Sequence, residues 1–131
     1  MRRVMIAAAV LMAGCGAESE QVQCRVSLVG SYAYAVRMAD NLPCESWPCR
    51  VQIDTELDNP CDGAATLSQS ITCGEQQGSF GPDCLHAVEH NAISGEFTAD
   101  AACSPRGVVT VEQNGESYEI AFASEVRWAP K

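Results

Sequence analysis

The cysteines constrain the fold of this chain more than any other feature of its sequence. Eight occur in 131 residues. Seven of them follow residue 23: Cys24, Cys44, Cys49, Cys61, Cys73, Cys84 and Cys103. This density is rare in the reducing cytosol and common in small exported domains, where disulfides supplement a modest core. Because seven is an odd number, at most three pairs form within one chain and one thiol is left over.

We expect one short disulfide that closes a turn and two longer ones that join the ends of expected strands. The expected pairs are Cys44–Cys49, Cys73–Cys84 and Cys24–Cys103. Cys61 is then the odd cysteine, either free or paired between chains. The alternative to disulfides is a zinc site. The spacings 44–49, 61–73 and 73–84 lack the paired C-x-x-C arrangement of zinc ribbons, so disulfides are favoured.

The N-terminus has the layout of an export signal. Residues 1–3 are basic after the initial Met, residues 4–13 form an apolar run, and Ala13 and Gly14 precede Cys15. Ten apolar residues match the core of a signal peptide and are too few to span a membrane. Small residues directly before a cysteine resemble the lipobox of bacterial lipoproteins, although Met12 stands where leucine is usual. The alternative is a plain secretory signal followed by a coincidental cysteine.

The lipoprotein resemblance, which covers residues 1–15 only, implies a signal peptide at 1–14 and a lipid on Cys15. Two or three acyl chains hold a protein stably on a bilayer. Residues 16–23 read as a polar tether that spans at most about 28 Å. In the lipoprotein family, Gly16 rather than aspartate after the lipidated cysteine favours the outer membrane. We therefore expect residues 15–23 to hold a domain of residues 24–131 at the bacterial cell envelope.

The charge balance of the chain is strongly acidic. Seventeen Asp and Glu face eight Lys and Arg, for a formal charge of −9. Removal of residues 1–14 takes away Arg2 and Arg3, which leaves six bases against 17 acids, or −11. Binding of nucleic acid needs Lys and Arg to neutralise phosphates, so we do not expect a nucleic-acid partner.

Alternation of apolar and polar side chains predicts strands along most of residues 24–131. The pattern has period two in residues 26–38, 50–57, 64–73 and 93–103. Residues 74–83 have the composition of a loop. Six or seven short strands separated by turns indicate a single all-β domain, either an antiparallel β-sandwich or a small barrel, stapled by disulfides.

Asn114-Gly115 is the clearest local signal in the chain. This pair favours a two-residue type I′ turn, in which both residues need positive φ. The turn then sets Val111 opposite Tyr118 and Val109 opposite Ile120. Apolar residues meet on one face and polar residues on the other, as a half-buried hairpin requires.

Candidate catalytic or metal-binding residues are sparse. His86 and His90 could share a metal on one face of a helix, whereas on a strand they would lie about 13 Å apart. We favour two solvent-facing histidines and expect no cofactor. Asp54, Glu56, Asp58 and Asp62 form an acidic patch, but Pro60 breaks the pattern of an EF-hand, so a solvated face is favoured. No G-x-S-x-G motif is present, and we do not expect an enzyme.

Trp47 lies between Cys44 and Cys49 and beside Pro48. Such an aromatic ring could anchor a partner or could cap the end of the core, and we favour the cap.

Three functions fit these observations. The first is a lipid-anchored, non-enzymatic binding or structural module of the cell envelope, which contacts a protein, glycan or exported ligand through loops at one end of the domain. The second is an inhibitor of secreted proteases or hydrolases, with Pro43–Cys49 as the inserting loop. The third is a metal carrier or enzyme that uses His86, His90 and nearby acids.

Overall fold

A computed structural model describes residues 24–128. The expected signal peptide 1–14, the lipidation site Cys15, the tether and the last three residues lie outside the described residues. The described residues form strands, turns and irregular segments, and they contain no helix long and apolar enough to cross a membrane. The strands are β1 Ser27–Val36, β2 Cys49–Asn59, β3 Ala65–Cys73, β4 Gln76–Leu85, β5 Glu89–Ala99, β6 Arg106–Gln113, β7 Glu116–Ala123 and β8 Val126–Arg127.

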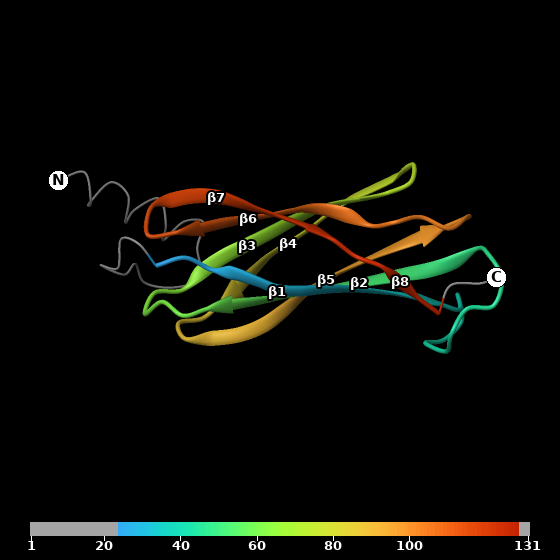
Figure 1. Ribbon diagram of the computed structural model, residues 1–131, viewed down its shortest axis with the longest axis horizontal. Coiled ribbons are helices and arrows are strands. Elements are labelled where there is room, and N and C mark those ends of the chain that lie inside the picture. The colour runs from blue at the N-terminus through green and yellow to red at the C-terminus, as the bar shows by residue number, and fades with distance from the viewer. Residues whose placement is uncertain (1–23, 129–131) are drawn as a thin grey trace.

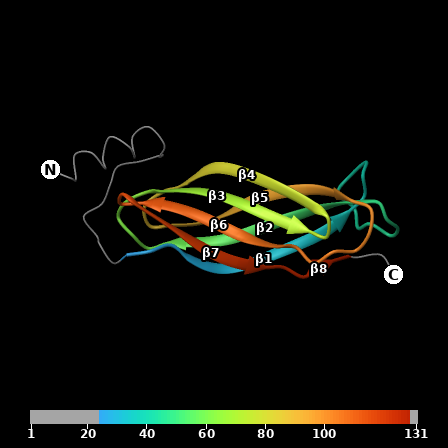
Figure 2. The same ribbon diagram turned by 90° about the horizontal axis from the view of Figure 1, so that it is seen from above.

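The strands form two separate four-stranded sheets that pack face to face (Figures 1 and 2). Sheet A has the order β5-β2-β1-β8, and sheet B has the order β4-β3-β6-β7. Neighbouring strands are antiparallel except for β1 and β8, which run parallel. The expected all-β fold is confirmed. The barrel alternative is wrong, because the two sheets do not join into one closed sheet.

The described residues contain eight strands, one or two more than the six or seven expected. β4 occupies most of residues 74–83, which we expected to be a loop. Its residues are mainly exposed because β4 is an edge strand, so they do not need the alternating apolar side chains that mark a buried face. β8 has two residues, too few for a periodic pattern.

Alternating side chains from both sheets fill the core. In β2, Thr55 and the apolar residues Val51, Ile53 and Leu57 are fully buried, while the residues that alternate with these four are partly exposed on the outer face. The three apolar residues pack with residues of sheet B such as Leu67 and Val111. The period-two pattern in the sequence therefore marks the face of each strand that the opposite sheet covers.

The predicted β6–β7 hairpin is confirmed in detail. Asn114 and Gly115 have φ of 56° and 79°, as a type I′ turn requires. Val111 lies opposite Tyr118, and Val109 opposite Ile120. Val109 and Val111 are fully buried, whereas Tyr118 and Ile120, which lie on the edge strand, are partly buried.

The two ends of the sandwich differ in the segments they hold (Figure 1). We call the end that contains Cys24 the proximal end; it also holds the turns at 60–64, 86–88 and 114–115. The opposite, distal end holds residues 37–48 between β1 and β2 and residues 100–105 between β5 and β6.

Three disulfides cross-link the described residues, and two of their pairings correct the expectation. Cys44–Cys49 is confirmed. The other two bonds are Cys24–Cys61 and Cys73–Cys103, in place of the expected Cys24–Cys103 and Cys73–Cys84. Antiparallel strands explain the difference. Cys24 and Cys61 lie at the proximal end and Cys73 and Cys103 at the distal end, so both rejected pairs would have to span the length of the sandwich.

The odd cysteine is Cys84 and not Cys61. Cys84 is exposed on β4 and carries a free thiol. Peptide mapping after alkylation of the unreduced, denatured protein should therefore label one of the seven cysteines after residue 23, Cys84. Cys84→Ser should abolish this label and leave the other six unlabelled. Label on Cys61 or Cys103 would contradict the pairing described above.

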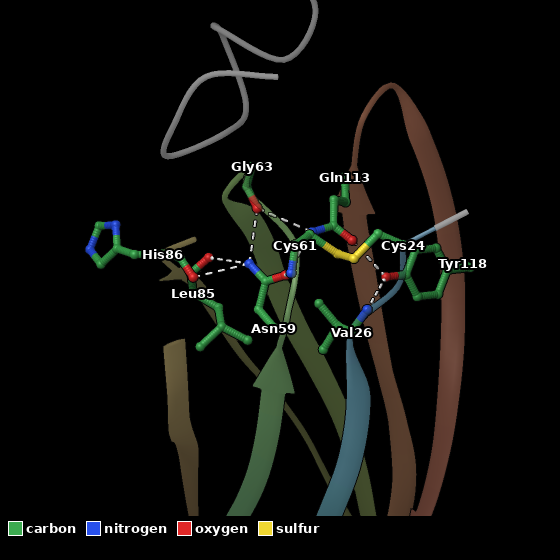
Figure 3. Close-up of a disulfide and its surroundings, with 9 residues drawn as sticks. All are labelled: Cys24, Val26, Asn59, Cys61, Gly63, Leu85, His86, Gln113 and Tyr118. Atoms are coloured by element: carbon green, nitrogen blue, oxygen red, sulfur yellow. Dashed lines mark hydrogen bonds between the residues drawn. A yellow bond between two sulfur atoms is a disulfide. The ribbon is translucent and has the colours of Figure 1, made fainter. Parts of the chain in front are cut away.

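A buried polar network secures the proximal end next to the Cys24–Cys61 disulfide (Figure 3). The Asn59 side chain is fully buried at the end of β2. Its amide nitrogen donates to the carbonyl oxygens of Gly63, Leu85 and His86 at 2.9, 3.3 and 3.0 Å. Its amide oxygen accepts from the Cys61 N–H at 3.1 Å and from Gln113 Nε2 at 3.0 Å. One side chain thus ties the β2–β3 and β4–β5 turns to the β6–β7 hairpin.

The network continues to the start of β1. The Tyr118 hydroxyl donates to Gln113 Oε1 at 2.9 Å and accepts from the Val26 N–H at 2.8 Å. Burial raises the pKa of Tyr118 above its ordinary value, so this hydroxyl keeps its proton at neutral pH. The proximal end is therefore held by hydrogen bonds among buried groups as well as by the disulfide.

Candidate functional site

The segment between β1 and β2, residues 37–48, folds back against the end of β1. We call it the distal segment. The Arg37 N–H donates to the Leu42 carbonyl at 2.9 Å, and the Cys44 N–H donates to the Ala35 carbonyl at 3.1 Å. Pro43 forms an isolated bridge with Val36. Together with the Cys44–Cys49 disulfide, these contacts fix the backbone of the distal segment.

The side chain of Arg50, the second residue of β2, anchors the distal segment to sheet A. Its Nε donates to the Arg37 carbonyl at 3.2 Å. Its Nη2 donates to the Asp40 carbonyl and to Asn41 Oδ1, each at 2.7 Å. Its Nη1 contacts Glu96 Oε2 on β5 at 2.7 Å. The planar guanidinium, with five N–H donors, can bridge the segment and the sheet in this way, which a lysine could not.

An ion pair between Arg37 and Asp40 closes the turn within the segment. The hydrogen bond from the Arg37 guanidinium, together with that from the Leu42 N–H to Asp40 Oδ1 at 3.0 Å, lowers the pKa of the Asp40 carboxyl to about 2. A carboxyl whose pKa is lowered by folding keeps its contacts above its ordinary pKa and loses them as the pH falls through the lowered value.

We expect this to be visible by NMR. The Leu42 amide resonance should titrate near pH 2, as Asp40 takes up a proton, and not near the ordinary aspartate pKa of about 4. Arg37→Gln removes the main cause of the shift, so the midpoint should then move up toward about 4. A midpoint near 4 in the unsubstituted protein would show that the Arg37–Asp40 contact does not form in solution.

The distal segment exposes two large apolar side chains on this fixed backbone. Met38 is 50% exposed and Leu42 is 54% exposed. Among the described residues, the other exposed large hydrophobics are Val29, Val88 and Trp128. Apolar side chains held in solvent by an ordered backbone can bind a partner without the entropy cost of ordering a loop. The sequence analysis did not single out Met38 or Leu42.

Trp47 takes the role of a cap. Its side chain is partly buried and packs against both clusters of core residues, including the one formed by Ala35, Cys44 and Cys49. In the segment Pro43–Cys49, which we considered as an inserting loop, both cysteine side chains are buried as well. Within the distal segment, the large apolar side chains exposed to solvent are thus those of Met38 and Leu42.

A second aromatic group lies at the β8 edge of sheet A. The Tyr34 and Trp128 rings have centroids 4.9 Å apart, and the Arg127 guanidinium lies 5.3 Å from the Tyr32 ring centroid and 5.9 Å from that of Tyr34. These contacts hold the short strand β8 against β1. We therefore infer that the main role of these aromatic residues is to hold β8 on sheet A.

The two histidines lie apart from any cluster of metal ligands. His86 is in the turn before β5, and its N–H donates to Glu89 Oε1 at 2.7 Å. His90 is on β5, and its Nε2 contacts Glu56 Oε2 at 2.9 Å. The helix that would have brought them to one face is absent here, because this stretch forms a turn and a strand. Within residues 24–128, no three His, Cys, Asp or Glu side chains gather where they could hold a metal.

The acidic patch on the strand β2 is part of the polar outer face of sheet A. Asp54 Oδ1 accepts a hydrogen bond from the Ser94 hydroxyl at 2.7 Å, and Glu56 contacts His90. These carboxylates are thus paired with neighbours on β5. This pairing agrees with a solvated face, as the sequence favoured.

Comparisons with known proteins do not identify a family for this chain. It matches no protein-family model and no curated protein. One similar solved structure is that of Pseudomonas fluorescens alkylpurine DNA glycosylase AlkC bound to DNA containing an abasic site analog. The alignment covers 95% of this chain and 36% of that chain, with a TM-score of 0.41 and 16% identity. The chain thus spans about a third of that protein, and a similarity at this level gives no guide to function.

Proposed function

We propose that this protein is a non-enzymatic binding module of the bacterial cell envelope, anchored through a lipid on Cys15. The observation that carries the proposal is the distal segment, which holds Met38 and Leu42 in solvent on a backbone fixed by a disulfide and by Arg50. This surface lies at the end of the sandwich opposite Cys24. A strand of ten residues spans about 33 Å, so a lipid anchor ahead of Cys24 would leave the distal segment well away from the membrane.

The partner we propose is another protein of the envelope or an exported protein. Apolar side chains such as those of Met38 and Leu42 gain free energy when a protein partner covers them. Arg37 and Asp40, which flank these side chains, would lie at the polar rim of such an interface. The outer membrane is the location favoured by Gly16.

Site-specific photo-crosslinking in the native membrane tests the proposal. A photoreactive amino acid at position 38 or 42 should give a discrete protein adduct, whereas the same amino acid at position 88 should not. Val88 is the matched control because it is 77% exposed but lies in a turn at the proximal end. Equal adducts at all three positions, or no adduct at 38 and 42, would count against a binding site on the distal segment. A protease as the adduct would support the inhibitor alternative.

The anchor needs its own test. Cys15→Ser should release the protein from the membrane fraction or leave it unprocessed, because the lipid attaches through the thiol. Metabolic labelling with a fatty acid should mark the unsubstituted protein and not this variant. Continued acylation of the variant would refute the lipid site at Cys15.

A further inference from the structure

Along one side of the sandwich, β4 and β5 lie next to each other but do not pair (Figure 2). β4 is an edge of sheet B and β5 is an edge of sheet A. On the opposite side the chain passes from β7 into β8, which covers the edge of β1. Within the part of the chain that the structure describes, neither β4 nor β5 has a strand paired on its outer side, so an additional strand could join either sheet here.

The free edge of β5 offers a long, regular row of backbone groups. β5 has 11 residues, and all of them pair with β2 without a register shift. In an antiparallel pair, alternate residues direct their N–H and C=O groups away from the partner strand. Among the described residues, no strand pairs with β5 on that outer side. These groups are thus free to pair with an incoming strand.

β5 lacks several of the features by which proteins usually protect an edge strand. Such features include proline, charged side chains, bulges and short length, and of these β5 has only charged residues such as Glu89 and Glu96. Neighbouring β4 has two more of them: it carries Pro82, and its pairing with β3 shifts register between Leu67 and Gln69. β8 has only two residues. β7, the fourth edge, has eight residues and likewise no proline, lysine or register shift. β5 shares these features and has 11 residues, so it is the longest regular edge for another strand to join.

Two hollows run along the same edge, and six consecutive residues of β5, 91–96, line them. The first has a volume of about 300 Å³, and the second about 430 Å³. The buried side chains of Leu67 and Ile93 border the first, and Phe80 borders the second. An added strand directs alternate side chains to opposite faces, so the hollows give places for the side chains on the inner face.

The charge along these hollows selects for a basic partner. Asp83 lines the first hollow, and Asp54 and Glu96 line the second. Glu96 is already ion-paired with Arg50, so Asp83 and Asp54 are the carboxylates left to attract a basic partner. No lysine or arginine lines either one. A second copy of this chain, paired by two-fold symmetry through β5, would bring the same acidic edge against itself. Like charges placed together across an interface oppose binding, so a second copy fits this edge poorly.

We propose that β5 binds an extended peptide with basic side chains, which joins sheet A as a fifth strand. Main-chain hydrogen bonds to β5 supply much of the affinity, while Asp83 and Asp54 favour Lys or Arg in the peptide. This site lies on the side of the sandwich and does not include the distal segment, so it is independent of the function proposed above.

Three peptides of about ten residues test the proposal with the full-length protein in detergent. The first alternates lysine and valine, the second alternates glutamate and valine, and the third is the first with every backbone nitrogen methylated. Only the first should bind, because the second has the wrong charge and the third cannot complete the strand hydrogen bonds. Binding should protect β5 amides from hydrogen exchange. It should also slow alkylation of the Cys84 thiol, which borders the first hollow.

Charge reversal provides the matched variants. Asp83→Lys should weaken binding of the basic peptide by about tenfold, since it places a like charge in the hollow. Glu119→Lys makes the same change in net charge on β7, an exposed position away from the β5 edge, and should alter binding less than about twofold. Neither exposed position contributes to the core, so both variants should fold. Equal weakening by the two variants, equal binding of the methylated peptide, no binding of the basic peptide, or self-association through β5 would overturn the proposal.

Discussion

Asn59→Ala should lower the free energy of unfolding by about 3–5 kcal/mol. The expected effect is large because this one buried side chain satisfies polar groups of three turns at the proximal end (Figure 3). Alanine would leave the carbonyl oxygen of Leu85, the N–H of Cys61 and the amide of Gln113 with fewer partners. Each buried polar group left unpaired costs about 1–3 kcal/mol.

Chemical denaturation, with the disulfides kept intact, measures this effect. Asn91→Ala is the matched control, because Asn91 is the same residue type but exposed on β5, and its loss should change the free energy of unfolding by less than about 0.5 kcal/mol. Asn59→Asp should also be strongly destabilising, since a carboxylate would face three carbonyl oxygens. If Asn59→Ala and Asn91→Ala had similar effects, the network of Figure 3 would not contribute to stability.

Gly107→Ala should lower the free energy of unfolding by about 3 kcal/mol or more. Gly107 lies on β6 against β3, and a Cβ atom there would stand 2.1 Å from the carbonyl oxygen of Ser70 and 3.0 Å from the Cα of Ile71. Both of these atoms belong to the backbone of a central strand. The clash can be relieved only if β6 moves away from β3, which weakens the hydrogen bonds between the two strands.

Gly30→Ala is the control for this substitution. A Cβ at Gly30 would also be close to another atom, the Tyr32 hydroxyl at 2.7 Å, but that atom is the far end of a side chain that can turn aside. Its cost in denaturation experiments should be below about 1 kcal/mol. A small effect of Gly107→Ala would mean that β3 and β6 are less tightly paired than described.

Local chemistry explains which parts of the fold were predictable from the sequence. The β6–β7 register follows from Asn114-Gly115 because a two-residue turn fixes every opposite pair in the hairpin. The pairing of Cys24 with Cys61 depends on where β2 ends relative to β1, which no local pattern encodes. β4 was missed because an edge strand does not need a buried face, so its sequence resembles that of a loop.

The candidate site was predictable only in part, for a similar reason. The sequence pointed to the turn around Trp47 through its prolines and cysteines, and the segment that contains this turn is the one held rigidly at the distal end. Whether a side chain points into the core or into solvent depends on tertiary packing. Trp47 therefore turned inward, while Met38 and Leu42, which stand in no distinctive pattern, proved to be the exposed pair.

The Cys24–Cys61 disulfide determines how a mechanical load would enter the domain. The chain ahead of Cys24 is joined through this bond to the residues that follow β2, as well as to β1 along the backbone. β2 lies between β1 and β5, and it pairs with both over most of its length. Tension on the N-terminal side is therefore shared with the most extensively paired strand of sheet A.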